Sequence, residues 1–528
     1  MKKQIKVILT LSTMAMVSLT SCGASKGYAG EVDPTVDTRG TTIEFWSGFG
    51  SDISAQLSDI VLKDFTDKYD ISVTHTTKGG YDGLQKAINL SASSVTYPNI
   101  AVGYPDHFAS YIDSDIQLRL DPFIASDAQI PATRTNEDGS TFNEAAKIDM
   151  DDFYSFYMTE VKNLEFDEDG KGYTLGLPFN KSTELFVYNK TFFDNEKVKA
   201  AGIAFPETWD DVETQGVKIK EFVKAAMGKV LGADGNVYTL PTDATAAGTT
   251  VLLNLISATE DTFFPFSYDS TANLFITGLR QWGATYTTVD TATRKGYIGF
   301  DTGDSYNKAL DFLTFMANLA KKGVLAAPKS FGGTDLYCSS YYTNFQTLGN
   351  IGSSAGLTHY ASGSFYQKNG YYSAMTHIPY KSADNKIVIS QGTNLCMLDK
   401  GTEAEREASW KAIKYLATEG NGTFAALTGY YPVCKTATAS KAYQDFLAGT
   451  GKDDNEKNKV SGAVANAEIY DAEGSGWTKF VDPGFNGSSS IRSAVDATMS
   501  TILTTKDVNA KSELDALIAS LRDYRRGA

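Results

Sequence analysis

The chain has 528 residues, a formal net charge of −15 at pH 7 and a sequence pI near 4.9. Such an acidic chain lacks the basic surface that the phosphates of nucleic acid require, so its composition argues against a nucleic-acid-binding protein. Without its leader the chain keeps roughly 500 residues, which is more than one hydrophobic core normally serves. We therefore expect two lobes or domains.

The first 22 residues have the pattern of a secretory signal. A positive start at Met1-Lys2-Lys3 precedes an apolar run over residues 7–19, and small residues lead to Cys22. The run is too short for a finished membrane span, so we expect an exported protein. The sequence LTSC at 19–22 also resembles the bacterial lipoprotein signal, in which residues 1–21 are removed and Cys22 carries a diacylglyceryl anchor at the outer face of the cell membrane. An ordinary cleaved signal with an incidental cysteine is the alternative.

Residues 22–40 are small and polar, as expected of a flexible tether. After the tether, residues 42–46 read as a strand, and apolar residues between 53 and 65 follow at helical spacing. A second strand over 71–75, a helix over 81–92 and a third strand over 99–104 come next. Alternating strands and helices predict parallel pairing with right-handed crossovers.

The same pattern returns in a strand over 185–189, a helix over 403–417 and a final amphipathic helix through residues 514–521. The polar segments 125–150 and 449–476 show no apolar period, so we interpret them as surface insertions. No segment after the leader is apolar enough to span a bilayer.

The remaining cysteines, Cys338, Cys396 and Cys434, form an odd set without C-x-x-C spacing. They predict neither a zinc site nor a full disulfide framework, and either one bridge or three buried thiols is compatible with them. With four histidines and no H-E-x-x-H motif, the chain lacks the usual ligands of a hydrolytic metal centre. We expect no metal and no cofactor.

One short motif raises the possibility of an enzyme. Residues 352–356 read G-x-S-x-G, which in a hydrolase would expose Ser354 as a nucleophile between a strand and a helix. Such an enzyme needs a histidine far downstream, and only His359 and His377 follow the motif. We therefore predict no enzymatic activity and keep a surface serine hydrolase as an alternative.

A dispersed set of segments resembles the solute-binding proteins of ABC importers. The most specific is GLPFNKST at 176–183, followed by YNK at 188–190 and PETWD at 206–210. Others are WSG at 46–48, GYD at 80–82, NIAV at 99–102, GSS at 352–354, QGTNL at 391–395, TGYYPV at 428–433 and SIR at 490–492. In order and content they are most similar to the carbohydrate-uptake branch, and within it to the glycerol-3-phosphate-binding proteins.

The resemblance implies a periplasmic-binding-protein-like α/β fold, in which two lobes with mixed sheets are joined by a hinge that the chain crosses several times. We expect residues 41–180 with 331–381 in lobe I, and residues 181–330 with 382–526 in lobe II. The crossings are expected near residues 178–180, 330 and 379–382. Ligands of open α/β sheets lie beyond the carboxyl ends of the strands, which agrees with a site between the lobes.

The resemblance also implies a function. The protein would be a monomeric extracellular receptor that captures a sugar or a glycerol-3-phosphate-like polyol phosphate and delivers it to the permease subunits of an ABC importer. A lipid anchor would hold it to the membrane. An adhesin or sensor that kept the fold without transport is a further alternative.

The family's ligand contacts fall on nine positions of this chain: Trp46, Tyr81, Asp106, Ser182, Ser353, Ser354, Gly392, Tyr430 and Arg492. Serine hydroxyls both donate and accept hydrogen bonds, as polyol recognition requires. Gly392 would allow a close backbone approach, although a bulge at a strand end explains it equally well. Tyr430 follows Gly429, a natural helix stop, and the turn alone does not explain an aromatic hydroxyl there.

Arg492 follows three serines in what we expect to be the first turn of a helix. A cation at that end opposes the helix dipole, and an anionic partner would relieve the conflict. A planar guanidinium beside exposed N–H groups suits a phosphate or carboxylate. Pairing with the nearby Asp496 is the alternative.

Two departures from the family's pattern leave the solute open. The family's acidic residue directly follows a strand tyrosine, whereas here Pro105 separates Tyr104 from Asp106. The family's tryptophan pair has no counterpart between Tyr238 and Phe266. An oligosaccharide, for which the many aromatic residues could supply stacking faces, is therefore the main competitor to a polyol phosphate.

Overall fold

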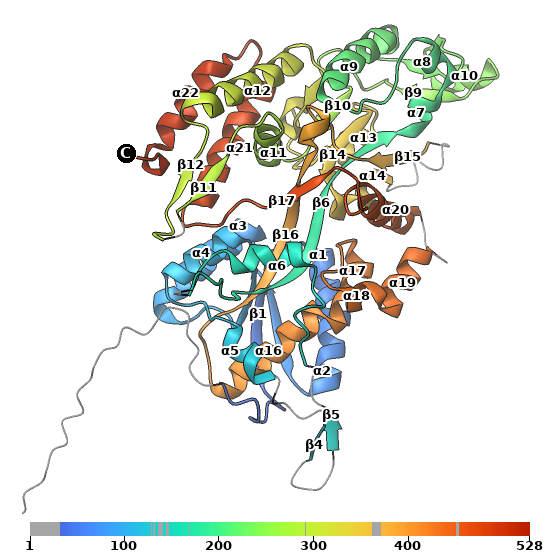
Figure 1. Cartoon of the computed structure of the whole chain (residues 1–528). Coiled ribbons are helices and arrows are strands. Elements are labelled where there is room, and N and C mark those ends of the chain that lie inside the picture. The colour runs from blue at the N-terminus through green and yellow to red at the C-terminus, as the bar shows by residue number, and fades with distance from the viewer. Residues whose placement is uncertain are drawn as a thin grey trace, which may run out of the picture.

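The computed structural model describes residues 32–127, 129, 133–135, 141–143, 147–167, 169–290, 292–361, 371–449 and 454–527. The predicted signal peptide and Cys22 lie outside the described residues. Two lobes lie one above the other, and the long strands β6 (Leu177–Asn189) and β16 (Ile387–Met397) run from one to the other (Figure 1).

The first lobe is built on the parallel sheet that the alternation of strands and helices predicts. β1 (Thr42–Ser47) pairs in parallel with β2 (Ser72–Thr77) and with β3 (Ile100–Gly103). Alternate residues of β1 are buried, so Ile43 and Phe45 enter the core. Covering helices are α1 (Ser51–Gln56), a π-helical turn (Leu57–Leu62), α2 (Lys63–Tyr69), α3 (Gly80–Ser91), α4 (Pro105–Asp113), α5 (Asp121–Asp127), α6 (Ser155–Lys162), α16 (Glu403–Ala417), α17 (Glu419–Thr428), α18 (Lys435–Ala439) and α19 (Lys441–Ala448).

Helix α16 occupies the residues that the sequence predicts. It begins after Thr402, whose hydroxyl accepts from the backbone N–H of Glu405 while the Glu405 carboxylate accepts from the backbone N–H of Thr402. This capping box satisfies two N–H groups that the first turn leaves free. The helix then buries Trp410 in the core of the first lobe.

The second lobe continues the same sheet beyond β6. β14 (Gly349–Ser353) is antiparallel to β6 and parallel to β10 (Phe266–Tyr268), which pairs with β13 (Leu325–Ala326). Further strands are β15 (Ser373–Thr376), β17 (Thr478–Phe480), the hairpin β11–β12 (Thr287–Val289, Gly296–Ile298) and a small sheet of β7 (Val230–Gly232), β8 (Val237–Tyr238) and β9 (Val251–Asn254). Its helices are α7 (Lys190–Asp194), α8 (Glu196–Ala200), α9 (Trp209–Val223), α10 (Pro241–Ala246), α11 (Thr271–Gln281), α12 (Gly303–Lys321), α13 (Ser339–Thr343), α14 (Thr358–Ala361), α20 (Asp454–Ile469), α21 (Ser488–Thr504) and α22 (Ala510–Ser520).

Each of the two crossing strands has residues in the cores of both lobes. Leu177 and Phe179 of β6 belong to the first core, and the core residues of β6 from Leu185 onward belong to the second. In the opposite direction, β16 leaves the second core after Ile389 and enters the first at Leu395. The strands pair antiparallel between these points, with a register shift between Thr393 and Asn394.

The apolar cores correct the predicted division of the chain. Residues 331–381 were expected in lobe I, yet Leu348, Ile351 and Ile378 pack in the second core. Residues 395–437 were expected in lobe II and pack in the first core. The chain crosses near residues 178–180 as predicted, but the return crossing falls within β16. Ser330 is not at a crossing, because it lies inside the second lobe and its hydroxyl donates to the backbone carbonyl of Leu503. Strand pairing between distant segments decides the division, and local patterns do not encode it.

The predicted insertions also differ from each other. Segment 125–150 includes the short hairpin β4–β5 (Thr133–Thr135, Thr141–Asn143), which projects from the first lobe in Figure 1. The prediction of a surface insertion is wrong for segment 449–476, because its helix α20 packs against α14, β15 and β6. Its Ala463 contacts a cluster with Ala425 and Tyr431, whereas Ile469 lies against the second core. This helix therefore carries the third crossing between the lobes.

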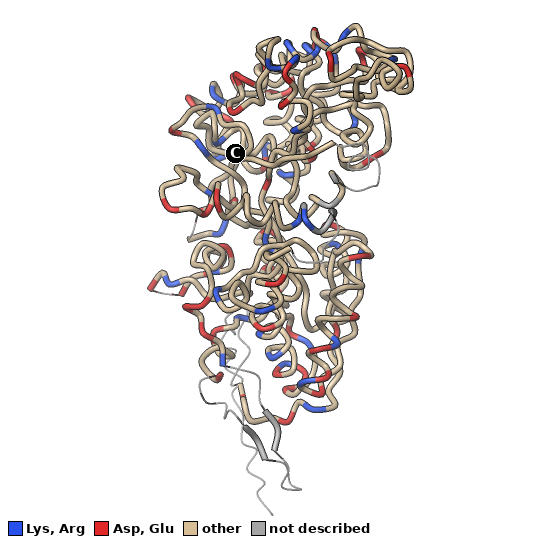
Figure 2. The backbone as a smooth tube through the Cα atoms, turned by 90° about the vertical axis from the view of Figure 1, so that its right-hand side faces the viewer, with Lys and Arg blue, Asp and Glu red and all other residues tan. Residues whose placement is uncertain are grey.

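The described part of the chain bears on the predictions about cysteines, membrane spans and metal sites. Cys338, Cys396 and Cys434 are buried free thiols, which agrees with one of the two alternatives. The helices found there all fall short of the length and apolar character that a membrane span needs. The same residues contain no cluster of His, Cys, Asp and Glu suited to a metal ion. Acidic and basic positions are interspersed over both lobes (Figure 2).

A polar contact joins the lobes at one side. The carboxylate of Asp113, at the end of α4, lies 2.7 Å from a guanidinium nitrogen of Arg294 and accepts from the amide of Asn486 at 2.8 Å. Arg294 follows β11, and Asn486 precedes α21, so both partners belong to the second lobe. About a third of each charged side chain is exposed, so water and salt screen the attraction.

We expect Asp113→Asn to shift the equilibrium toward a more open arrangement of the lobes. A partly exposed ion pair contributes about 0.5–1 kcal/mol, so the closed-to-open ratio should fall about two- to fivefold. Small-angle scattering should record a larger radius of gyration for the variant at low salt and a smaller difference at high salt. Asp304→Asn, which removes a carboxylate paired with Lys308 within α12, is the matched control. An unchanged radius of gyration for Asp113→Asn would show that the contact does not hold the lobes.

Candidate functional site

A cavity of about 430 Å³ lies between the lobes, within the range of small-molecule sites. The first lobe contributes residues at the starts of α3 and α4, and the second lobe contributes α11, β11, residues 481–484 and the first turns of α21. Residues 389–391 of β16 line it at the crossing. The cavity is therefore bounded by both lobes and by a strand that connects them.

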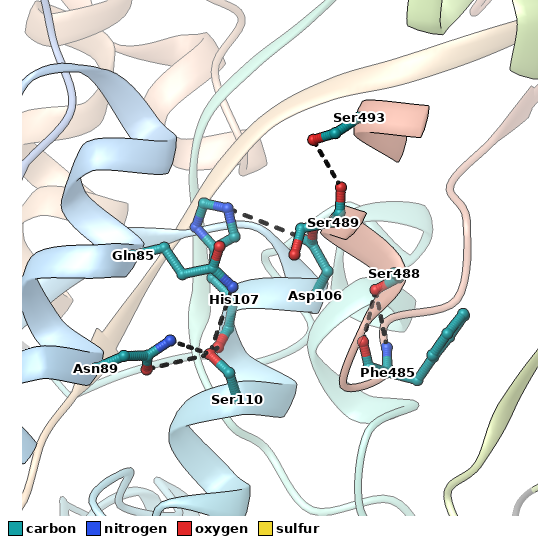
Figure 3. A network of polar contacts seen from close by, with 9 residues as sticks. All are labelled: Gln85, Asn89, Asp106, His107, Ser110, Phe485, Ser488, Ser489 and Ser493. Atoms are coloured by element: carbon teal, nitrogen blue, oxygen red, sulfur yellow. Dashed lines mark hydrogen bonds and ion pairs between the residues drawn. The ribbon is translucent and has the colours of Figure 1, made fainter. Parts of the chain in front are cut away.

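The first-lobe wall is acidic. Tyr104 ends the segment after β3, Pro105 occupies the first position of α4, and Asp106 therefore stands in the first turn, where the helix dipole favours a carboxylate. The nearest basic group within ion-pair distance is Nε2 of His107, 4.0 Å from Asp106 Oδ1. Burial lowers the pKa of His107, so the imidazole is neutral at pH 7. Asp106 thus has no charged partner among the described residues, and it faces the first turn of α21 (Figure 3).

The second-lobe wall is the start of α21, which is rich in serine. The Ser488 hydroxyl donates to the carbonyl of Phe485 at 2.7 Å, and the Ser493 hydroxyl donates to the carbonyl of Ser489 at 3.1 Å (Figure 3). The backbone N–H groups of this turn and the helix dipole favour a negative charge in front of it. The turn is thus suited to an anion or to the oxygen atoms of a polar molecule.

Arg492 brings a positive charge to this wall. Its guanidinium donates to Oδ1 of Asn273, and no carboxylate among the described residues lies within ion-pair distance of it. The predicted alternative pairing with Asp496 is wrong, because that carboxylate accepts from the hydroxyl of Thr271 and the backbone N–H of Ala272 at the start of α11. The charge of Arg492 is therefore available to a molecule in the cavity.

Several residues of the cavity wall have buried polar atoms that find no partner in the described part of the chain. They are His107 Nδ1, the Tyr286 hydroxyl, Thr287 Oγ1, Ser390 Oγ and Gln391 Oε1. A buried polar group without a hydrogen bond costs about 1–3 kcal/mol. A polar molecule rich in donors and acceptors would recover part of that cost.

The structure brings three of the nine predicted contacts together. Tyr81, Asp106 and Arg492 line the cavity, and Tyr81 packs edge-on against Tyr104 at 5.2 Å between ring centroids. The other six positions, Trp46, Ser182, Ser353, Ser354, Gly392 and Tyr430, do not line it.

The two aromatic residues outside the cavity have structural roles. The ammonium of Lys78 lies 3.7 Å from the centroid of the Trp46 ring, a cation–π contact. Tyr430 stacks on Phe424 with 5.9 Å between centroids and is 9% exposed. The Tyr430 ring lies close enough to Tyr81 that it contributes, after burial, to raising the pKa of Tyr81. It therefore supports a wall residue from behind.

The predicted serines form hydrogen bonds within the protein, in the region where the strands cross between the lobes. The Ser353 hydroxyl donates to Ser182 Oγ at 3.4 Å, and Ser354 Oγ accepts from the backbone N–H of Thr183 at 3.2 Å. Ser354 is 1% exposed, whereas a nucleophile elbow must present its serine to substrate. The hydrolase alternative therefore has no accessible nucleophile at this position.

Gly392 is explained by the close approach of β6 to β16. Its φ of +98° is a conformation that side-chain-bearing residues rarely adopt, and a Cβ there would lie 1.7 Å from the carbonyl oxygen of Asn180. Glycine thus lets the two crossing strands approach each other.

Sequence reasoning missed other wall residues. His107, Asn273, Tyr286, Gln391 and Ser489 line the cavity. The serine run before Arg492 and the polar residue next to Gly392 were the available signals for Ser489 and Gln391. Asn273 and Tyr286 lie in segments without a distinctive motif, and only the folding of the second lobe brings them to the cavity.

We expect Gly392→Ala to lower the free energy of unfolding by about 2 kcal/mol or more, since the new methyl group meets backbone in a strained conformation. Urea denaturation measures the loss. Gly356→Ala is the matched control, because a Cβ there meets no atom within 4 Å and its φ is not positive. Equal midpoints for both variants would contradict the structural role of Gly392.

Comparison with known families gives one match along the chain. The family model described as "Bacterial extracellular solute-binding protein" matches residues 61–448, which is more than two thirds of the sequence. No curated protein matches the chain.

Solved structures share the fold at low sequence identity. UgpB from Mycobacterium tuberculosis, in complex with glycerophosphocholine, is 14% identical with a TM-score of 0.62, and the alignment covers 92% of this chain and 98% of that one. The substrate-binding protein Lmo0181 from Listeria monocytogenes, in complex with cycloalternan, is 13% identical with a TM-score of 0.60, covering 92% and 98%. Maltose-bound MalE3 from T. maritima is 14% identical with a TM-score of 0.60, covering 92% and 99%. The predicted two-lobed α/β fold is confirmed.

Proposed function

This chain belongs to the bacterial extracellular solute-binding protein family, and from that premise we propose that it is the receptor of an ABC importer, which captures a sugar or a polyol phosphate between its lobes and delivers it to the permease. The family's activity is the binding of a solute, not catalysis. The observation that carries the proposal is the cavity itself, where a guanidinium from one lobe and a carboxylate from the other lie among hydroxyl and amide groups.

The chemistry of the wall supports a hydroxylated solute. Asp106 can accept hydrogen bonds from sugar or glycerol hydroxyls, and the unpartnered atoms of Ser390 and Gln391 can pair with others. Arg492 and the first turn of α21 suit a phosphate, since a guanidinium binds phosphate oxygens through two parallel N–H donors. The ligands named for the similar structures, glycerophosphocholine, cycloalternan and maltose, belong to these same chemical classes.

The location of the protein follows in part from the family, whose members are extracellular. We propose in addition that Cys22 is the lipidated N-terminus of the mature protein. Two buried acyl chains anchor stably where one holds only marginally, at about 0.8 kcal/mol per buried methylene.

Arg492→Ala tests whether the solute is anionic. A thermal-shift screen of glycerol 3-phosphate, glycerophosphocholine, maltose and maltotriose first identifies a ligand, because binding stabilises the folded state. For a phosphate ligand, calorimetry should then show a loss of about 1.5–3 kcal/mol in Arg492→Ala, roughly tenfold or more in affinity. Arg492→Lys should recover only part, since an ammonium lacks the bidentate fork.

Arg525→Ala is the matched control, because Arg525 pairs with Asp301 in the same lobe and does not line the cavity. Near-equal dissociation constants for the wild type and both Arg492 variants would reject the phosphate and favour a neutral oligosaccharide. Failure of every compound in the screen would count against the proposed solute classes.

Cys22→Ser tests the anchor. We expect the variant to leave the membrane fraction while it keeps its affinity for the solute, because the residues that line the cavity are unchanged. Cell fractionation after a high-salt wash measures the distribution. Persistence of the variant in the membrane fraction would exclude the acyl anchor as the cause.

A further inference from the structure

Behind Arg492, a line of hydrogen bonds leads away from the cavity to a buried carboxylate on a crossing strand. Arg492 donates to Asn273 Oδ1, and Asn273 Nδ2 donates to Glu184 Oε1 at 2.9 Å. The hydroxyl of Tyr268 donates to Glu184 Oε2. Glu184 lies on β6, directly after the crossing, where it pairs with Ser353 of β14. The cavity's cation is thus connected to the strand that joins the lobes.

Glu184 is 1% exposed and has no direct cationic partner among the described residues. Burial raises its pKa to about 7, opposed by the hydrogen bonds from Tyr268 and Asn273 and by the charge of Arg492. The neighbouring Asp269 raises the pKa further. Tyr470, which follows α20, donates its hydroxyl to the backbone carbonyl of Glu184. These are the charged and titratable groups that face Glu184 from the elements packed against it.

We propose that Asn273 and Glu184 form a proton-linked relay, which holds the Arg492 guanidinium while Glu184 is ionised and releases it to the anionic group of a solute when Glu184 is protonated. The inference rests on the proposed function, because it assumes that Arg492 meets a solute anion. It makes Asn273 and Glu184 positioning residues of that site.

The hydrogen-bond chemistry supports the relay. An ionised carboxylate only accepts, so it binds the amide N–H of Asn273 and thereby turns Asn273 Oδ1 toward Arg492. A protonated Glu184 can donate, which removes the constraint on the orientation of Asn273. The backbone on either side is fixed by α11 and by the pairing of β6 with β14. The two protonation states of Glu184 thus hold Arg492 differently without any movement of the lobes.

The sign of the pH dependence follows from linkage. An anion bound at Arg492 adds negative charge near Glu184 and partly cancels the positive charge that stabilises the ionised form. Binding therefore raises the pKa of Glu184 and takes up a proton, so affinity for an anion increases as pH falls through about 7. Burial lowers the pKa of His107, which moves its titration away from that of Glu184.

Binding of sulfate, which keeps its charge between about pH 6 and 8, measures the relay directly. We expect the wild type to bind sulfate about fivefold more tightly at about pH 6 than at about pH 8, which corresponds to a rise of about 1 in the pKa of Glu184 on binding. Glu184→Gln should bind with nearly constant affinity across the range. Glu165→Gln, which changes a carboxylate that pairs with Arg119 and does not line the cavity, should keep the wild-type profile. A wild-type profile in Glu184→Gln would overturn the relay.

A measurement without any solute separates the relay from the proposed function. Infrared spectroscopy follows the protonated carboxyl band of Glu184, assigned as the band absent from Glu184→Gln. We expect a midpoint near 7 in the wild type and higher midpoints in Arg492→Gln and Tyr268→Phe, since each removes an interaction that favours the ionised form. An unchanged midpoint in Arg492→Gln would overturn the relay, whatever the solute. If the midpoints shift as expected but no anion binds, the result supports the relay and rejects the proposed anionic solute.

Discussion

The antiparallel pairing of β6 with β16 is the constraint on which the rest of the structure depends. These strands belong to both lobes, so the pairing of residues 177–183 with residues 390–395 spans the junction between the lobes. The pairing buries the ammonium of Lys181, which binds the carboxylate of Glu160 at 2.5 Å and the carbonyl of Gly392 at 3.3 Å. A buried charge without such partners would cost several kcal/mol, so the crossing tolerates little rearrangement of these residues.

The same strands bring the cavity and the lobe junction together. On the second-lobe side of Gly392, β16 places Ser390 and Gln391 in the cavity wall, and β6 places Glu184 behind Arg492. A molecule in the cavity therefore contacts residues of both lobes and of their connection at once. Such an arrangement couples the state of the site to the geometry of the lobes, as expected of a receptor that closes around its solute.

The cavity combines opposite charges on opposite walls. Asp106 stands at the start of α4 in the first lobe, and Arg492 stands just after the first turn of α21 in the second, one residue later in the helix than the sequence predicts. Neither has an ionic partner among the described residues, so each is free to select a complementary group on the solute. Because the two walls belong to different lobes, a solute that satisfies both also stabilises the closed arrangement.

The sequence by itself determined the local elements and indicated the family. Apolar period and capping residues depend only on neighbours in the chain, so α16 and the strands of the first lobe appear where the pattern predicts them. The family resemblance in the sequence also pointed to Tyr81, Asp106 and Arg492, which line the cavity. Only the tertiary structure decided the division into lobes and the roles of Ser354, Gly392 and Tyr430. These depend on the pairing of β6 with β14 and β16, which joins segments more than 150 residues apart, and no local pattern encodes such contacts.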